Sequence, residues 1–404
     1  MITENMKITI CYRMIKVGSD TLDLINDISL MDEIFNEEIK YSKKYGIEIK
    51  NISHWDSSNA FKSHMSQSLV IPEQSLPWDY YYTYSISEKD RQTVIKKLGV
   101  NTSIDSTMCL LLQSSTIAIV NMINFLIHHN MKKLCILQPS YFSVSSCCEM
   151  FSLNYSYEQI EFTDNNPIIP VDKIISGGYD CLWITSPIYC TSYYFDKEQY
   201  EQIQFLREKG LTIVFDESLA LPGKELLRTF SVDENTFAIY SPHKSLSING
   251  LKFSAIVCHR NNEEFLEQWV DIFSGALSSS NRDAILHYIS SNYIQECYPA
   301  YKLYIEKTKN IVYDIANRHS TVCTLPNTSG HYISIFTGLK LNSNYEIFCA
   351  VSEIIKNCYT SIIPGSLNGF DDSKGLSFRV NLTGDIHDIT NSLERILYHI
   401  ENCY

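Results

Sequence analysis

Positive charge is scarce in this sequence. Its 404 residues include 33 lysines and arginines against 46 aspartates and glutamates, which gives a formal net charge of −13 at pH 7. A phosphate backbone or an anionic membrane surface is bound mainly by clustered positive charge. We therefore expect neither a nucleic acid nor a membrane as a partner.

Long apolar runs and a secretory leader are missing as well. No stretch of the sequence approaches the ~18 uncharged apolar residues that a membrane-spanning helix needs. The first residues carry Glu4 where a signal peptide has positive charge, and they lack an adequate apolar run and a small-residue cleavage site. The sequence predicts a cytoplasmic protein.

The cysteines do not follow a metal-binding or disulfide pattern. All 13 are scattered, and the only close pair is Cys147 and Cys148, with no couple separated by two residues. Structural zinc sites need such couples, and disulfide frameworks are typical of secreted chains. His128 and His129 also lack partners at ligand spacing. We expect reduced thiols and no metal site.

Short apolar runs rich in β-branched and aromatic residues alternate with longer helical patterns. A hydrophobic content of 45% is enough for one large or two ordinary domains with a core. The predicted strands cover 108–113, 133–139, 179–187, 211–218, 236–242 and 251–259. Helices are predicted over 114–130 and 196–210, the second ending at Gly210. This alternation predicts an α/β fold with a mainly parallel central sheet flanked by helices.

The pattern changes from about residue 296. Long amphipathic helices then surround a few predicted strands, among them 330–338 and 375–384. We therefore divide the chain into an N-terminal segment (1–55), a large domain (56–295) and a smaller α+β domain (296–404).

Two charged residues stand next to predicted buried strands. Asp216 ends the apolar run "TIVF", and Lys244 follows the strand over 236–242. Ligands of open parallel sheets bind at the carboxyl ends of the strands. A carboxylate there can hold a proton on a ring nitrogen, and a lysine can form an imine with an aldehyde.

A possible phosphate site lies at the start of the helix predicted over 114–130. Ser114, Ser115 and Thr116 open this helix, whose first N–H groups and dipole favour an anion. Ser241 and Lys252, three residues before and eight after Lys244, can add a hydroxyl and a cation.

An aromatic residue completes the pattern. Tyr141 follows Pro139 and Ser140 at the end of another predicted strand, where its ring can stack on a flat ligand. Together with the lysine, the aspartate and the phosphate turn, it predicts a site for pyridoxal 5'-phosphate. Each residue also has an ordinary interpretation: a solvated loop lysine (Lys244), a helix cap (Asp216; Ser114, Ser115 and Thr116) or a core ring (Tyr141).

The sequence resembles the fold type I pyridoxal-phosphate-dependent enzymes of the class I/II aminotransferase superfamily, from about residue 55 to the C-terminus. The resemblance lies in the order and spacing of "SST", "PSY", "SP…T", "FDES", "SPHK…GLK" and "FRVN". It implies that Lys244 is the Schiff-base lysine and that Asp216 pairs with the pyridine nitrogen. It also implies that Arg379 binds the substrate α-carboxylate through a bidentate fork, although alone this arginine reads as a surface ion pair.

The sequence departs from the family at the contacts to the cofactor's phenolic oxygen. The family's usual asparagine is replaced by Tyr189, its usual tyrosine by Leu219, and a common phosphate-binding arginine by Lys252. We expect the Tyr189 hydroxyl to bond this oxygen, the alternative being that its ring only packs in the site. Because both usual donors are absent, the reaction type is less fixed than the cofactor.

Two further residues are implied by their place in the family pattern. In the aromatic segment 71–85, Tyr82 is the candidate to reach the cofactor phosphate of a neighbouring subunit, with a packed loop or an oligomer surface as the alternative. Asp56 falls where an N-terminal arm covers the substrate, and it can favour a basic side chain or merely form a turn.

The resemblance implies a homodimeric aminotransferase that acts on an amino acid. A lyase, cyclase, decarboxylase or oxidase of an amino acid in the same superfamily is the alternative. A non-catalytic cofactor-binding relative is a further one, but residues 1–55 do not look like the DNA-binding module that such regulators carry.

Overall fold

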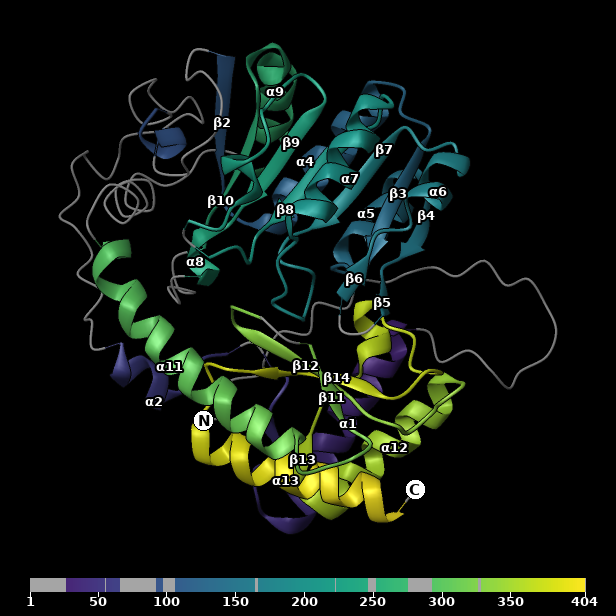
Figure 1. Cartoon of the computed structure of the whole chain (residues 1–404), viewed down its shortest axis with the longest axis vertical. Coiled ribbons are helices and arrows are strands. Elements are labelled where there is room, and N and C mark those ends of the chain that lie inside the picture. The colour runs from purple at the N-terminus through teal and green to yellow at the C-terminus, as the bar shows by residue number, and fades with distance from the viewer. Residues whose placement is uncertain are drawn as a thin grey trace.

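The computed structural model describes residues 27–54, 56–65, 92–96, 106–163, 166–221, 223–245, 252–274, 293–325 and 328–403. These residues form two units, each built on its own β-sheet (Figure 1). The larger unit occupies the upper half of the view and the smaller unit the lower half, with α8 at the side of the larger unit that faces the smaller one.

The larger unit contains a seven-stranded sheet in the order β2-β10-β9-β8-β7-β3-β4. Its strands are β2 (Thr107–Leu112), β3 (Lys133–Gln138), β4 (Asn154–Gln159), β7 (Cys181–Thr185), β8 (Thr212–Glu217), β9 (Thr236–Tyr240) and β10 (Ser254–His259). β10 runs antiparallel to both of its neighbours, and the pairs from β9 to β4 are parallel. The prediction of a mainly parallel sheet is confirmed.

Both faces of this sheet are buried beneath helices, and successive side chains of a strand point to opposite faces. Ile213 and Phe215 of β8 lie in one hydrophobic core, where Ile203 and Leu206 of α7 cover them. Val214 lies in a second core beneath helices α4, α5 and α9. Parallel strands covered on both faces need continuous apolar runs, and this explains why the strands could be predicted.

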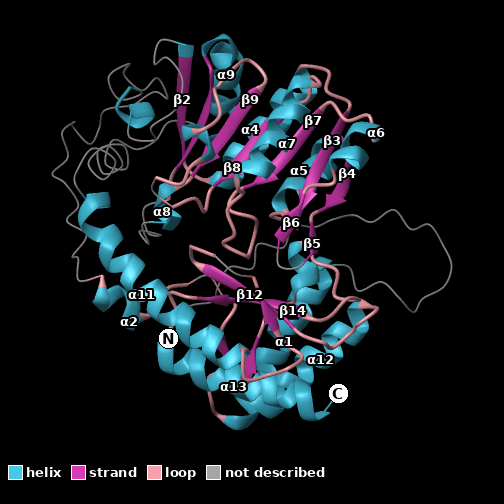
Figure 2. Cartoon of the chain, viewed as in Figure 1, coloured by secondary structure: helices cyan, strands magenta, loops and turns pink. Residues whose placement is uncertain are grey.

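The helices of the larger unit are α4 (Ser115–His128), α5 (Ser143–Phe151), α6 (Val171–Ser176), α7 (Lys197–Glu208), α8 (Pro242–Ser245) and α9 (Glu263–Ser274). Asp196 caps α7 in a capping box with Gln199, and Gly210 follows the helix with a φ of +95° that a glycine adopts freely. A small hairpin, β5 (Glu161–Thr163) and β6 (Asn166–Ile168), stands beside the sheet (Figure 2).

The smaller unit is built on the strands β11 (Cys323–Thr324), β12 (Tyr332–Phe336) and β14 (Ser377–Asn381). Its helices are α1 (Asp27–Tyr45), α2 (Asn59–His64), α11 (Tyr293–Ala316), α12 (Asn344–Cys358) and α13 (Ile386–Cys403). β1 (Lys50–Asn51) pairs in parallel with β13 (Thr360–Ser361), and a 3₁₀ turn, Gly365–Asn368, precedes β14. Two further 3₁₀ turns, Leu226–Arg228 and Arg260–Asn262, belong to the larger unit.

The N-terminal residues pack differently from the division made on the sequence. Leu30 and Ile34 of α1 share one hydrophobic core with α11, α12 and α13. Phe61 and Met65 lie in the same core, although the boundary at residue 56 assigned them to the large domain. The described part of residues 27–65 therefore belongs to the smaller unit. Its burial depends on segments that follow much later in the sequence, so the local sequence pattern does not predict it.

The other structural expectations can be compared with the described residues. None of the helices among them is both long and apolar enough to cross a membrane. Ten cysteines of these residues carry free thiols, and within the same part of the chain no three potential ligand side chains gather around a metal position.

Candidate active site

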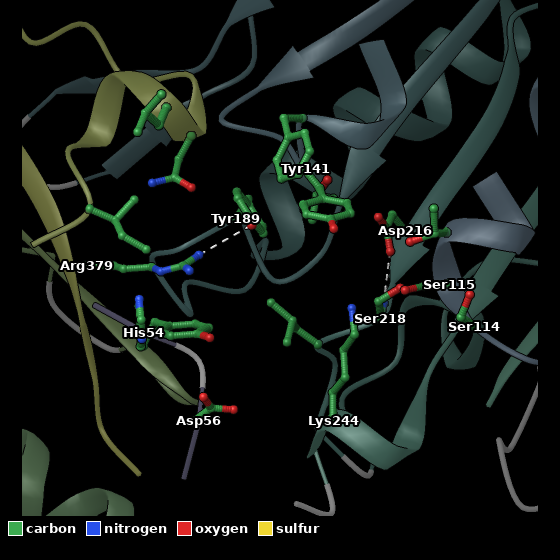
Figure 3. Close-up of a pocket in the computed structure, with 18 of the residues that line it drawn as sticks. His54, Asp56, Ser114, Ser115, Tyr141, Tyr189, Asp216, Ser218, Lys244 and Arg379 are labelled. Carbon is green, nitrogen blue, oxygen red and sulfur yellow. Dashed lines mark hydrogen bonds between the residues drawn. The ribbon is translucent and has the colours of Figure 1, made fainter. Parts of the chain in front are cut away.

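A cavity of about 470 Å³ lies where the two units meet. The larger unit contributes the ends of its strands, the start of α4 and the region of α8, and the smaller unit contributes residues of β12, β14 and the 3₁₀ turn Gly365–Asn368. Figure 3 shows Arg379 on one side of the cavity and Asp216, Ser114 and Ser115 on the other. The Lys244 side chain extends toward the part of the cavity that Tyr141 and Asp216 line.

Lys244 stands in α8, the single helical turn after β9. Burial of its amine lowers the Lys244 pKa, and the positive charges of Lys252 and Arg379 lower it further, while Asp216 opposes the shift. Its Nζ lies 5.8 Å from the centroid of the Tyr141 ring. A lysine whose pKa is depressed presents more of the neutral amine, the form that attacks an aldehyde.

Asp216 occupies the carboxyl end of β8 with only 3% of its surface exposed. The backbone N–H of Ser218 donates to its Oδ1 at 3.1 Å. Asp216 lines the cavity, so this nearly buried carboxylate can accept a hydrogen bond from a protonated ring nitrogen of a ligand.

The start of α4 forms another wall of the cavity. Ser114 is the N-cap, and its Oγ accepts from the N–H of Ile117 at 3.3 Å. Ser115 and Thr116 follow it, and all three residues line the cavity. The helix of 14 residues therefore points its positive end at the space, as a phosphate site requires.

The two other predicted phosphate contacts differ in position. Lys252 lines the cavity, where its ammonium can pair with a phosphate. Ser241 is fully buried and is not among the cavity-lining residues. Its Oγ lies 2.8 Å from the Ser254 Oγ and 3.5 Å from the Ser218 Oγ, so its hydroxyl is engaged within the protein. The sequence could give its spacing from Lys244 but not this partner on the next strand.

Arg379 is held from several sides. Its Nε donates to the carbonyl of Ser53 at 2.9 Å, and its Nη1 donates to the Tyr189 hydroxyl and to the Cys190 Sγ, each at 3.3 Å. Its Cζ lies 4.7 Å from the centroid of the Tyr332 ring, a cation–π distance. These contacts fix the guanidinium in place on the cavity wall. None of the described residues forms a hydrogen bond with its Nη2.

Tyr189 also lines the cavity, but its hydroxyl is oriented toward the arginine. The oxygen accepts from the Arg379 Nη1 (Figure 3), and the ring centroid lies 5.8 Å from that of Tyr141. Burial raises the pKa of Tyr189 well above its usual range, with Cys190 adding to the rise and Arg379 opposing it. The hydroxyl therefore keeps its proton as a donor. Its predicted bond to a cofactor oxygen stays a prediction.

The N-terminal side of the cavity is formed by His54 and Asp56. Asp56 is exposed, and its carbonyl accepts from the Asn381 Nδ2 at 3.0 Å, which ties this segment to β14. Tyr82 and the rest of the aromatic segment 71–85 lie outside the described residues.

Several cavity residues were not predicted from the sequence. Thr185 and Ser218 lie near the ends of the predicted strands 179–187 and 211–218, beside the motif "SP…T" and Asp216. His243 precedes Lys244, and burial lowers its pKa to about 4, with the charge of Lys244 contributing. Asn368 carries no motif, and only the fold brings it here: its carbonyl accepts from the Ser140 N–H at 3.2 Å.

No protein-family model matches the chain, and no curated protein matches it in sequence. Solved structures do resemble it. The aspartate aminotransferase of Thermotoga maritima has a TM-score of 0.71 at 14% identity, covering 94% of this chain and 98% of that chain. The alanine aminotransferase of Pyrococcus furiosus gives 0.71 at 14% identity, with coverages of 92% and 97%.

The aromatic aminotransferase of Pyrococcus horikoshii is similar to the same degree. Its TM-score is 0.71 at 14% identity, with 93% of this chain and 99% of that chain covered. Such coverage means that both units, and not the large sheet alone, correspond to those structures. The likeness confirms the predicted fold class, and the chain has the fold of these aminotransferases.

Proposed function

We propose that the protein is a pyridoxal 5'-phosphate-dependent aminotransferase that acts on an amino acid. The observation that carries this proposal is the composition of one cavity. A half-buried lysine, Lys244, and a buried carboxylate, Asp216, line it together with the start of α4, and a fixed arginine, Arg379, lines its other side.

The residues around the cavity fit this cofactor. A phosphate suits the start of α4 and Lys252, a pyridinium nitrogen suits the Asp216 carboxylate, and an aldehyde suits the Lys244 amine. The ring of Tyr141 supplies a flat apolar surface beside them. When bound, pyridoxal phosphate supplies an electron sink for bonds at the α-carbon of an amino acid.

The residues of the chain then divide the work of the reaction. Arg379 binds the α-carboxylate of the substrate through its guanidinium, whose orientation Ser53 and Tyr189 hold. The Lys244 amine would be the general base that takes the α-proton and the general acid that delivers a proton to the cofactor carbon and not back to the α-carbon. Asp216 would hold a proton on the ring nitrogen, and the burial of this carboxylate would shield that contact from water.

A second candidate function is favoured by Leu219. It lines the cavity at a place where the family has a tyrosine, and its side chain has no hydrogen-bond donor. A changed contact to the cofactor's phenolic oxygen suits an elimination, cyclisation, decarboxylation or oxidation of an amino acid in the same cavity. A relative that binds the cofactor without catalysis is the remaining alternative.

We also propose that the protein is a cytoplasmic homodimer. The free thiols of the described cysteines agree with a reducing compartment. Tyr82 is proposed to contact the cofactor phosphate of the second subunit, and Asp56, exposed at the cavity wall, to favour a basic substrate side chain.

The test is to mix the purified protein with pyridoxal 5'-phosphate and then with single amino acids, without an amino acceptor. Accumulation of pyridoxamine phosphate and a 2-oxo acid identifies a transaminase. Ammonia, carbon dioxide, hydrogen peroxide or a cyclised product, with the aldehyde form retained, identifies the second candidate.

Lys244→Ala is the matched variant for this test. It should remain folded by circular dichroism, lose the covalent cofactor that borohydride reduction and mass spectrometry detect, and lose turnover. Turnover at the wild-type rate in this variant would refute the assignment.

A further inference from the structure

His331 links the smaller unit to the backbone of Lys244. Its Nε2 lies 2.6 Å from the Lys244 carbonyl oxygen, across the boundary between the two units. A carbonyl oxygen only accepts, so the imidazole is the donor. The histidine is 8% exposed and is not among the cavity-lining residues. His331 therefore does not contact a ligand in the cavity, and it can affect the proposed reaction only through Lys244.

The bond to His331 is made by the backbone of a short helix. The described residues of α8 are Pro242 to Ser245, and Lys244 lies within this turn. The Lys244 N–H bonds back to the Ser241 carbonyl at 3.1 Å, which fixes one end of the turn. The bond from His331 fixes the other end.

His331 is itself held firmly. The Leu382 N–H donates to its carbonyl at 2.7 Å, and the edge of the Tyr301 ring meets the imidazole with a centroid distance of 5.3 Å. Its neighbour Tyr332 donates its N–H to the Ser192 Oγ at 3.1 Å, in the loop that carries Tyr189. Few alternative positions remain for the imidazole.

The neighbouring residue connects this contact to the other side of the cavity. Tyr332 begins β12, and its ring lies against the Arg379 guanidinium at 4.7 Å. His331 thus contacts the backbone of Lys244, and the next residue, Tyr332, contacts Arg379, which is proposed to bind the substrate carboxylate. The distance between amine and cation depends on how this dipeptide is seated.

We propose that His331 is a positioning residue that sets the place of Lys244 relative to Arg379 by donating its Nε2–H to the Lys244 carbonyl. This inference rests on the proposed function, since it assumes that Lys244 binds the cofactor. It concerns a residue of the smaller unit outside the cavity, and its failure can be told apart from failure of the assignment itself.

The experiment compares two substitutions of His331 in the full-length protein. His331→Phe keeps a ring but removes the donor, whereas the amide of His331→Gln can place a nitrogen near the position of Nε2. Tyr301→Phe is the matched control, because it alters a ring that touches His331 without altering the hydrogen bond. The Tyr301 hydroxyl has no hydrogen-bond partner among the described residues.

Two measurements report on Lys244 directly. The first is the rate at which pyridoxal 5'-phosphate becomes covalently attached to protein freed of cofactor, followed by mass spectrometry after reduction. Loss of one neutral hydrogen bond should slow attachment in His331→Phe by roughly 3- to 10-fold. His331→Gln should recover most of the rate, and Tyr301→Phe should match the wild type.

The second measurement is the pH titration of the visible band of the holoenzyme. The band would report protonation of the imine that Lys244 forms, and a less firmly seated Lys244 admits water, which favours the protonated, charged imine. The midpoint should therefore rise in His331→Phe, by at most about one unit, and return in His331→Gln. A purely structural role predicts lower thermal stability with an unmoved midpoint.

The outcomes separate the two proposals. A wild-type protein that attaches no pyridoxal 5'-phosphate overturns the proposed function. A wild-type protein that attaches it, with attachment rate and titration midpoint unchanged in folded His331→Phe, overturns the role of His331. Equal defects in the Phe and Gln variants also overturn it, because a donor restored near the position of Nε2 then recovers nothing.

Discussion

Two buried histidines should make the folded protein sensitive to mild acid. His243 and His331 are 3% and 8% exposed, and each contacts a backbone carbonyl: His243 Nδ1 lies 2.7 Å from the Phe253 oxygen and His331 Nε2 lies 2.6 Å from that of Lys244. Burial lowers the pKa of each to about 4, from 6.5, and the positive charge of Lys244 contributes to both shifts.

The sign of the effect follows from proton binding. Above pH 6.5 both histidines are neutral in the folded and the unfolded chain, and they contribute nothing. Below it the unfolded chain takes up a proton at each ring that the folded chain takes up only near pH 4, so the free energy of unfolding falls. Between pH 7 and pH 5 each histidine should cost roughly 2 kcal/mol, about 4 kcal/mol for both.

Urea unfolding at pH 7 and pH 5, with and without substitutions, tests this value. His243→Asn and His331→Gln keep an amide near the donor nitrogen but cannot be protonated, so each should remove about half of the histidine contribution. Carboxylates also titrate in this range, and subtracting the variant from the wild type cancels them. A wild-type pH dependence that persists in both variants would refute the burial of neutral rings.

Two predictions concern the side of the cavity around Arg379. Arg379→Lys keeps the charge but loses the fork and the bond to Ser53, so substrate binding should weaken by roughly 1–3 kcal/mol, measured as KM or Kd with carboxylate-bearing and carboxylate-free amines. Equal affinities for both amine classes in wild type and variant would assign the carboxylate elsewhere. Tyr189→Phe removes only a hydroxyl that accepts from Arg379. A changed pH titration of the bound cofactor's visible band supports the predicted bond to its phenolic oxygen, whereas weaker substrate binding with an unchanged titration leaves Tyr189 as a partner of Arg379 alone.

The fold of the larger unit could be predicted because its strands are apolar on both faces. Such strands form short continuous runs, as 212–217 shows, and turns and helices separate them. The direction of β10 could not be predicted, because antiparallel and parallel central strands have the same composition when both faces are buried. Its pairing with β2 and β9 is fixed by the tertiary fold.

The site could be predicted in part. Lys244, Asp216 and Ser114 stand at strand or helix ends, where a local pattern gives their position, and all three line the cavity. His331 and Asn368 have no comparable signal, because one reaches α8 from the position just before β12 and the other lies in a 3₁₀ turn of the smaller unit. Contacts made between separately folded segments leave no periodicity in either segment.

The pairing of β1 with β13 has a consequence for the synthesis of the protein. Lys50 pairs with Thr360, and α1 packs against α12 in a core that it shares with α11 and α13. At ordinary translation rates the N-terminal segment waits roughly 15 to 60 s on the ribosome before these partners emerge. During that time Leu30 and Ile34 lack their native packing partners. We therefore expect a nascent chain to bind chaperones, or to aggregate, through this segment. A circular permutant that makes residues 27–65 follow residue 403 should shorten this exposure.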